Sequence, residues 1–329
     1  MKIKDKIESG YSARSVARFK RKIPLAVRLQ LTNKCDNRCL YCNVWNTKSE
    51  EYSTQEVFSL LNELKKMGTK TISFSGGEPL LREDIGEIID YCKNLNISPS
   101  MNSRGALIEE KIRELKNLDQ IKVSIDGPEE IHDFHARKKG AYQQSIRAVE
   151  TALAHGLQVI LTTTITRFNL DHLEFVLELA ERYNILVAFQ PLKRLARGVE
   201  DMDDLYPEVE KYKRAIERLI LLKKKGNKHM RNSLIGLKHI WHWPDYNGRL
   251  PCAAGKIFCI IETNGDLYPC DRIRYPVKLP NCRELGFERA FAMLPQVDCD
   301  GCGFCGTLEL NLLMSFRPDI LSTIWKVFK

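Results

Sequence analysis

Three cysteines within one short stretch constrain this chain more than any other feature. Cys35, Cys39 and Cys42 are separated by three and then two residues, and they follow an apolar run at 25–31. This order predicts a loop that leaves a strand and gathers three thiolates around one inorganic core. Three thiolates bind three irons of a cubane cluster, so the fourth iron keeps an open position at which chemistry takes place.

The rest of the composition favours metal ligation over disulfides. The chain has 11 cysteines in 329 residues, and its N-terminus lacks the apolar core of a secretory signal. No apolar run reaches the length of about eighteen residues that a membrane-spanning helix needs. We therefore expect a cytoplasmic protein. Zinc is the alternative metal for the triplet. It would need a fourth Cys or His ligand nearby, and the nearest histidine in the sequence is His132.

Basic residues gather at the N-terminus. The net charge is +9, and the first 22 residues hold eight basic against two acidic side chains. The segment 1–24 is therefore either a solvated arm or a surface for anionic lipid or an acidic substrate. The amphipathic tail 307–329 poses the same choice, because it either docks on its own domain or meets a membrane. A peripheral contact with an anionic membrane remains open.

Residues 25–193 alternate short β-rich runs with longer helical ones. This alternation predicts parallel βα units with right-handed crossovers and an α/β fold, a partial (β/α)6 TIM-like barrel whose site lies at the carboxyl ends of the strands. Thr54 and Asp171 look like helix N-caps. The predicted strands are 26–31, 71–75, 97–101, 121–125, 159–164 and 186–190, and the predicted helices are 54–67, 82–95, 109–117, 142–155 and 171–183.

A second part of the chain follows the barrel. Residues 194–249 turn charged and helical, which predicts a linker or cap. Residues 250–306 form a small cysteine-rich domain, in which an Asn-Gly turn at 264–265 predicts a hairpin. A zinc ribbon is the alternative for this domain, because four close thiolates also suit zinc. Its cysteines are Cys252, Cys259, Cys270, Cys282, Cys299, Cys302 and Cys305.

The cysteine triplet resembles the signature of the radical S-adenosylmethionine (SAM) enzymes, including the aromatic Tyr41 before the third cysteine. The run from Gly76 to Pro79, Gly-Gly-Glu-Pro, is similar to the glycine-rich motif of that family. The resemblance implies a [4Fe–4S] cluster ligated by Cys35, Cys39 and Cys42, whose open iron is chelated by the amino and carboxylate groups of SAM. It also implies an external one-electron reductant of the flavodoxin or ferredoxin type.

The same resemblance implies further SAM contacts. Glycines let the backbone approach a ligand closely, and Glu78 is expected to pair with the SAM ammonium group. The turn 102–105, with Ser103, resembles the family's Thr-Asn-Gly-type turn. The strand 159–166 is expected along the adenine, on which Tyr41 either stacks or simply packs. The ribose hydroxyls and the methionine carboxylate are expected on this set: Ser103, Ser124, Asp126 and Arg137.

The C-terminal cysteines resemble the SPASM/Twitch extension of radical SAM enzymes. The pieces 252–255 and 265–270 match its opening elements, whereas no cysteine follows Cys305. Two complete auxiliary clusters need eight thiolates, and the region holds seven, so we expect one auxiliary Fe–S cluster of the [4Fe–4S] type. Its expected ligands are Cys252, Cys270 and two of Cys299, Cys302 and Cys305, with Cys259 and Cys282 as alternatives.

The predicted function is radical chemistry on a substrate that the sequence does not identify. A peptide, a cofactor precursor, a lipid or another small molecule all remain open, and the short stretch before the cluster loop lowers the peptide hypothesis. The alternative is a non-catalytic, zinc-binding interaction module. Binding to nucleic acid is not supported, because basic and aromatic residues are not interleaved.

Overall fold

The computed structural model describes residues 22–192, 202–246, 252–270, 278–295 and 302–314. Residues 1–21 of the basic segment 1–24, Cys299 and the tail from 315 onward lie outside these ranges, so the predictions made for them remain predictions.

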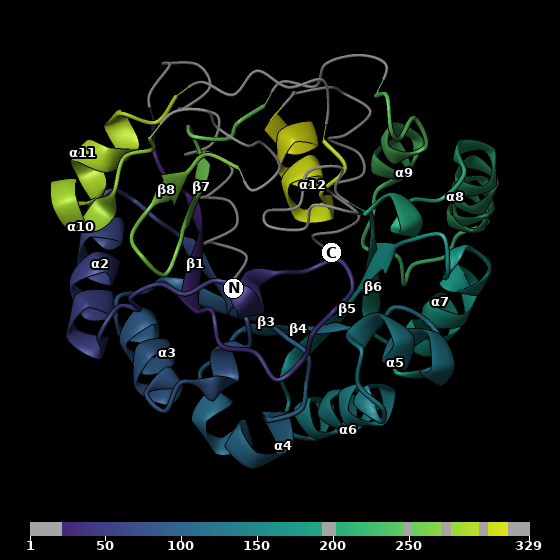
Figure 1. Cartoon of the computed structure of the whole chain (residues 1–329), viewed down its shortest axis with the longest axis horizontal. Coiled ribbons are helices and arrows are strands. Elements are labelled where there is room, and N and C mark those ends of the chain that lie inside the picture. The colour runs from purple at the N-terminus through teal and green to yellow at the C-terminus, as the bar shows by residue number, and fades with distance from the viewer. Residues whose placement is uncertain (1–21, 193–201, 247–251, 271–277, 296–301, 315–329) are drawn as a thin grey trace.

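One curved sheet runs through the described residues, and helices cover its outer face (Figure 1). Its strand order is β6-β5-β4-β3-β2-β1-β7-β8, and neighbours from β1 to β6 pair in parallel. The strands are β1 (Ala26–Thr32), β2 (Thr71–Gly76), β3 (Ser98–Ser103), β4 (Gln120–Ser124), β5 (Gln158–Ile165), β6 (Leu186–Pro191), β7 (Phe258–Ile261) and β8 (Leu267–Tyr268).

The helices of the first part follow the strands in turn, so that each crossover returns over the same face of the sheet. They are α2 (Thr54–Lys66), α3 (Ile85–Asn94), α4 (Ile108–Lys111), α5 (Glu129–Ala136), α6 (Ala141–Ala154) and α7 (Leu173–Arg182). The later helices are α8 (Val209–Lys224), α9 (Leu234–Ile240), α10 (Cys282–Leu285), α11 (Phe287–Ala292) and α12 (Cys305–Met314).

The partial barrel predicted from the sequence is confirmed. Each of the six predicted strands is present within two residues of its expected ends. The helix α5 was not predicted. The cap predictions were wrong: Ser53, not Thr54, caps α2 and forms a capping box with Glu56, and Asp171 lies in a 3₁₀ turn before α7.

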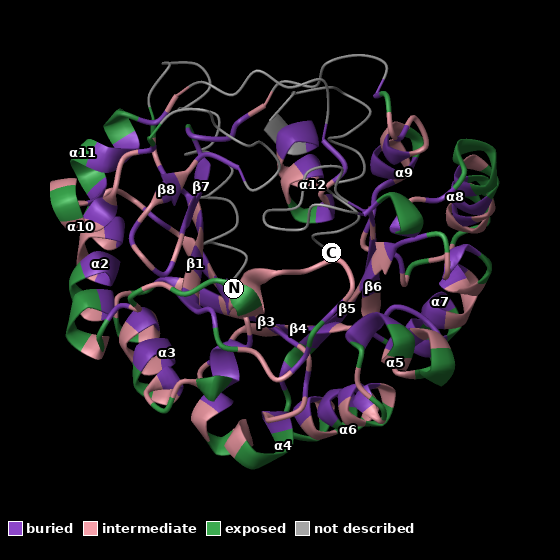
Figure 2. Cartoon of the chain, viewed as in Figure 1, coloured by how far each residue is buried: buried purple, intermediate pink, exposed green. Residues whose placement is uncertain are grey.

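The two faces of the sheet differ in polarity. Outward residues such as Leu29 and Phe74 are buried against the helices and form the main apolar core (Figure 2). The alternate residues face the concave side, the barrel lumen, and many of them are polar and half-buried. The alternation therefore places apolar packing outside and polar side chains inside.

The C-terminal hairpin is continuous with this sheet. Strand β7 pairs in parallel with β1, aligning Arg28 with Ile260, and β8 pairs antiparallel with β7 after the Asn-Gly turn. Strand β1 is therefore flanked on both sides, by β2 and β7. The division of the chain into a barrel, a linker and an auxiliary domain remains a prediction.

Helix α12 lies between the two ends of the curved sheet (Figure 1). The guanidinium of Arg28 in β1 stacks over the ring of Phe304 at 4.6 Å, and the thiol of Cys305 lies 3.6 Å from Gln190 Oε1 in β6. The start of α12 thus bridges the open side of the barrel. No helix in the described part of the chain combines the length and apolar character needed to cross a bilayer.

Candidate cofactor site

The cysteine loop follows β1 and is held in place by α5. Within the loop, the Cys42 amide donates to the Cys39 carbonyl at 3.1 Å. The amides of Arg38 and Leu40 donate to carbonyls at the end of α5, at 3.3 and 3.0 Å. Lys138, just after α5, forms an ion pair with Asp36 at 2.6 Å. The helix that the sequence did not predict therefore supports the loop backbone.

Two glycines at the end of β2, Gly76 and Gly77, let the next loop pack on the start of the cysteine loop. The amide of Gly77 donates to the Thr32 carbonyl at 2.8 Å. A Cβ on Gly76 would lie 2.1 Å from that carbonyl oxygen, and one on Gly77 would lie 2.0 Å from the Lys34 oxygen. No real Cβ fits there, and Gly76 also has a φ of 138°. The glycines are thus required by contact with the chain itself.

Glu78 lies in a closed, hydrogen-bonded environment. Its carboxylate is fully buried and accepts hydrogen bonds from Ser103 Oγ at 3.0 Å, the Arg104 amide at 2.8 Å and the Leu80 amide at 3.2 Å. Burial raises the pKa of Glu78 to about 7, although these donors oppose the shift. These hydrogen bonds join the loops after β2 and β3, and the contact of Glu78 and Ser103 with SAM stays a prediction.

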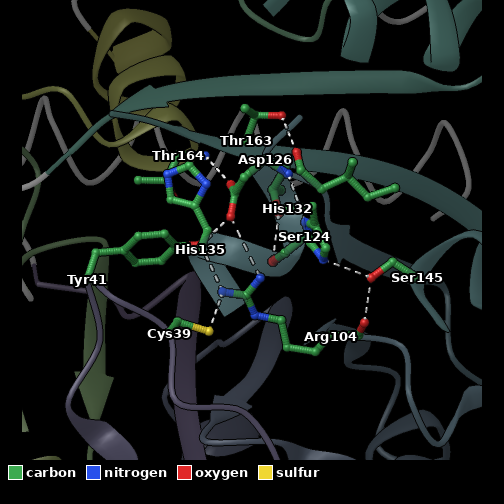
Figure 3. A network of polar contacts seen from close by, with 12 residues as sticks. Cys39, Tyr41, Arg104, Ser124, Asp126, His132, His135, Ser145, Thr163 and Thr164 are labelled. Carbon is green, nitrogen blue, oxygen red and sulfur yellow. Dashed lines mark hydrogen bonds and ion pairs between the residues drawn. The ribbon is translucent and has the colours of Figure 1, made fainter. Parts of the chain in front are cut away.

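Arg104 is the centre of a buried polar network (Figure 3). Its Nη2 donates to the Sγ of Cys39 at 2.7 Å and to the hydroxyl of Tyr41 at 2.8 Å. Its Nη1 lies 3.7 Å from Asp126 Oδ2, and the two side chains are only 12% and 1% exposed. Burial lowers the pKa of Arg104, but Cys39, Tyr41 and Asp126 raise it more, so the side chain stays charged.

Asp126 is likewise held by the chain. Its Oδ2 accepts from the Tyr41 hydroxyl at 2.5 Å, and its Oδ1 accepts from the Thr164 amide at 2.9 Å. Its own amide donates to His132 Nδ1 at 3.1 Å. Burial raises the pKa of Asp126, but Arg104 and the two nearby histidines lower it further, so the carboxylate is ionised. The polar atoms of Asp126 thus fix β4 against the cysteine loop and β5.

The other residues predicted to contact SAM differ in their surroundings. Ser124 is half-buried on the lumen face, with its Oγ 3.4 Å from Thr162 Oγ1, so it remains accessible to a ligand. Tyr41 is half-buried and bonded to both Arg104 and Asp126, which supports packing instead of free stacking. Arg137 is exposed at the C-terminal end of α5 and is not part of the network around Arg104.

The donor set fits a polar cofactor beside a cluster. No three Cys, His, Asp or Glu side chains of the described residues converge as metal ligands. Four buried polar atoms around the loop nevertheless have no hydrogen-bond partner among those residues, and these atoms suit a ligand with both acidic and basic groups. They are Asp36 Oδ1, Asn37 Oδ1, Ser75 Oγ and Arg104 Nη1.

Burial keeps the thiols of Cys35 and Cys39 protonated in the absence of metal. Burial raises the pKa of Cys35 to about 11. Burial also raises the pKa of Cys39, although Arg104 opposes the shift. Because thiolates are the ligands, metal binding at this loop must displace protons.

The C-terminal cysteines gather around α12. Cys252 and Cys270 belong to one apolar cluster, which Leu310 of α12 also contacts. The side chain of Asn311 accepts from the Ala253 amide at 2.9 Å, and its Nδ2 lies 3.9 Å from Cys252 Sγ. The thiols of Cys302 and Cys305 are buried at the start of the same helix. Cys259, Cys282 and Cys302 are all buried in the main core, so burial there does not separate ligands from packing thiols.

These features define a class: a partial barrel with a three-cysteine loop at the carboxyl end of its first strand. The model of the radical SAM superfamily matches residues 29–180. Residues 29–180 thus form a radical SAM domain, and the protein is an enzyme with a [4Fe–4S] cluster and SAM as its cofactors. Its cysteine-rich C-terminal part corresponds to the SPASM/Twitch-like extension, which carries auxiliary Fe–S chemistry.

Curated relatives include mycofactocin maturases. The chain is 28% identical over 267 residues to mycofactocin maturase MftC of Mycolicibacterium smegmatis, a match that covers 78% of this chain and 67% of the maturase. The enzyme of Mycobacterium tuberculosis is 27% identical over the same shares.

Solved structures support the fold. The chain matches anSMEcpe with bound SAM at a TM-score of 0.66 and 19% identity, covering 82% of this chain and 80% of that one. It matches SuiB of Streptococcus suis bound to SAM at 0.63 and 14% identity, covering 78% of this chain but only 62% of SuiB.

Two charged residues near the site were not recognised in the sequence. Arg104 lies in the turn 102–105. A basic residue directly after a buried strand is the sequence feature that could have revealed it. Lys122 lies in the middle of β4 on the lumen face. A charged residue inside a regular strand is the sequence feature that could have revealed it. Burial, with Arg231 and Arg28 nearby, lowers the pKa of Lys122 to about 7.

Proposed function

We propose that this protein uses SAM at the cysteine loop to modify a peptide substrate by hydrogen abstraction. A single observation carries the cofactor part: the loop after β1, the glycines after β2 and the network after β3 and β4 all meet at one end of the barrel. When bound, the cluster and SAM supply a one-electron cleavage to methionine and a 5′-deoxyadenosyl radical.

The chain's own residues position and shield this chemistry. Cys35, Cys39 and Cys42 are the proposed cluster ligands. Arg104 orients Cys39 through its 2.7 Å contact with the sulfur. The backbone around Gly77 and the hydroxyl of Ser124 are proposed SAM contacts. Glu78 and Asp126 stay proposed contacts as well, although each also has partners within the chain.

A peptide is favoured as substrate by the relatives. The maturase MftC is one of them, and a solved form of SuiB is bound to its precursor peptide SuiA, with a TM-score of 0.62. The reaction also requires an external one-electron donor, for which we propose a flavodoxin or ferredoxin. A cytoplasmic location belongs to the same proposal, because the ten described cysteines are free thiols and reducing conditions keep them so.

The auxiliary cluster belongs beside α12. We propose Cys252, Cys270, Cys302 and Cys305 as its ligands, because the described members of the extension lie around this helix. Cys299 is the replacement if one of them does not bind. The zinc-module alternative is set aside, because the chain belongs to an enzyme family that uses iron–sulfur chemistry.

Substitution of a loop cysteine tests the cofactor part. We expect Cys39→Ala to lose about four irons per chain and all formation of 5′-deoxyadenosine from SAM after anaerobic reconstitution. The matched control is Cys92→Ala, because Cys92 is buried in α3 and its thiol lies 3.6 Å from the Ile97 carbonyl. Continued SAM cleavage by Cys39→Ala, or equal iron loss in both variants, would contradict the assignment.

A further inference from the structure

Gln190 joins the barrel lumen to the cysteine-rich extension. It lies on the lumen face of β6, and both ends of its side-chain amide contact other described residues. On one side, the thiol of Cys305 donates to Gln190 Oε1 at 3.6 Å. On the other side, Gln190 Nε2 donates to the Thr164 hydroxyl at 3.4 Å. A proposed ligand of the auxiliary cluster therefore touches a side chain of the barrel.

Thr164 holds the far side of this amide in place. It aligns with Gln190 where β5 pairs with β6. Its amide donates to Asp126 Oδ1 at 2.9 Å (Figure 3), and its carbonyl accepts from Asn169 Nδ2 at 2.9 Å. Asp126 and Asn169 are fully buried, so the backbone of Thr164 is fixed by side chains that cannot move far. The hydroxyl of Thr164 thus has a defined position beside Gln190.

Loss of the thiol proton changes what the contact between Cys305 and Gln190 can be. Thiolates are the ligands of iron–sulfur clusters, so a ligating Cys305 gives up the proton that it donates to Gln190. A thiolate beside the amide oxygen would place two acceptors against each other. Rotation about the last side-chain bond of Gln190 exchanges its oxygen and nitrogen, and the amide then presents an N–H group to the sulfur.

The Thr164 hydroxyl suits both orientations of the amide, because a hydroxyl both donates and accepts. It accepts from Gln190 Nε2 while Cys305 is protonated, and it donates to Gln190 Oε1 after the rotation. Its hydrogen has no acceptor within the part of the chain that the structure describes, so no other bond has to break. The rotation therefore exchanges hydrogen bonds without leaving a polar group of Gln190 unpaired.

We propose that Gln190 donates a hydrogen bond to the sulfur of Cys305 when Cys305 ligates the auxiliary cluster, and that Thr164 orients the amide for this contact. The inference rests on the proposed function, which makes Cys305 a cluster ligand. Hydrogen bonds to cluster sulfurs help to set reduction potentials, and a donor stabilises the more negative, reduced state. Gln190 is therefore a positioning residue that raises the potential of the auxiliary cluster and makes it a better electron acceptor.

Spectroscopic redox titration of the reconstituted enzyme without SAM measures the midpoints of both clusters. Gln190→Met removes the donor and nearly keeps the side-chain volume. The auxiliary midpoint should fall by about 59 mV, a tenfold change in the reduction equilibrium for one electron, and the first cluster should not shift. Thr164→Val should lower the auxiliary midpoint by a smaller amount, and Thr164→Ser should retain the wild-type value. The control is Gln120→Met in β4, because the Gln120 amide donates to Gln158 Oε1 at 2.9 Å, at an exposed position.

Three outcomes would remove the role of Gln190. They are a wild-type auxiliary midpoint in Gln190→Met, an equal fall in Gln120→Met, and loss of auxiliary iron from Gln190→Met that is folded by circular dichroism. Iron content and formation of 5′-deoxyadenosine in the wild type test the proposed function separately. About eight irons per chain with SAM cleavage leave only the role of Gln190 in question. About four irons would instead remove the auxiliary cluster, and the role of Gln190 with it.

Discussion

The contact between Arg104 and Cys39 is the most consequential residue pair in the structure. A guanidinium within hydrogen-bond distance of a proposed cluster ligand stabilises negative charge on the sulfur. Hydrogen bonds to cluster sulfurs are among the factors that set reduction potentials. The same cation also balances Asp126 at the end of β4.

Removal of this cation should lower the potential of the SAM-binding cluster. We expect Arg104→Met to reduce SAM cleavage about 10- to 100-fold, as is typical for residues that orient a metal ligand. Spectroscopic redox titration should show a more negative midpoint for the first cluster and no change in the auxiliary cluster. Arg104→Lys should restore part of the potential. An unchanged midpoint in Arg104→Met would leave Arg104 a purely structural role.

His132 should make stability depend on pH. It is fully buried, and burial lowers its pKa to about 4. Its Nδ1 accepts a hydrogen bond from the Asp126 amide, so protonation of that nitrogen would place two N–H groups against each other. The unfolded chain binds the proton below about pH 6.5, so stability should fall as the pH falls from 6.5 towards 4, by up to about 1.4 kcal/mol per unit.

Chemical denaturation of wild type and His132→Gln between pH 7 and 4.5 checks this dependence. The wild type should lose stability more steeply than the variant over that range. His155→Gln is the control, because His155 is exposed and should leave the slope unchanged. Parallel slopes for wild type and His132→Gln would contradict the interpretation.

Sequence reasoning located the site but did not reveal the contacts that its residues make with one another. The triplet and the Gly-Gly-Glu-Pro run depend on short-range spacing, so they were visible. The SAM contacts expected of Glu78 and Asp126 stay predictions, whereas their partners within the chain, Ser103, Arg104 and Tyr41, lie 25 to 85 residues away. Spacing carries no information on such contacts, and Arg104 was overlooked for the same reason.

At the scale of elements, the loops after β1 and β2 are held together by direct backbone contact. The amides of Gly77 and Glu78 donate to the carbonyls of Thr32 and Lys34, each at 2.8 Å. These bonds position the cysteine loop before any metal arrives. Any side chain at Gly77 must push the two loops apart.

Gly77→Ala should therefore destabilise the fold by about 3 kcal/mol and lower the iron content of the first cluster. Gly156→Ala is the matched control, because Gly156 has a φ of 75° but no neighbouring atom within 4 Å of the place that a Cβ would take. That substitution should cost only about 1 kcal/mol of backbone strain and leave the iron content unchanged. Denaturant midpoints and iron analysis measure both variants. Equal iron loss in the two would contradict the packing argument.

The strands were predictable because outward residues such as Leu29, Phe74 and Leu161 alternate with polar lumen residues over lengths typical of strands. Helix α5 was missed because it is short and carries five charged or histidine residues among its eight positions. The pairing of β7 with β1 joins residues more than 230 positions apart in the chain. No local pattern reports such a pairing.

At the scale of the whole molecule, α12 joins parts that are distant in the sequence. Asn311 is 1% exposed, and its Oδ1 accepts a hydrogen bond from the Ala253 amide. Its neighbour Leu310 packs on the cluster of Cys252 and Cys270. The arrangement around the proposed auxiliary cluster thus depends on one buried amide side chain.

Asn311→Leu should leave the Ala253 amide without its partner, at a cost of about 1–3 kcal/mol. Hydrogen exchange should accelerate in 252–261 and remain unchanged in 98–125, and the auxiliary cluster should lose iron before the first cluster does. Thr307→Ala on the same helix is the control. Uniform exchange throughout the chain would show that α12 does not organise this region.

The pairing of β1 with strands on both sides affects how the enzyme can be truncated. A fragment that stops at residue 246 would lose β7 and turn β1 into an edge strand with open N–H and C=O groups, directly before the cysteine loop. Such a fragment is expected to self-associate through that edge. The family domain and the cysteine-rich extension are therefore best handled as one inseparable folding unit.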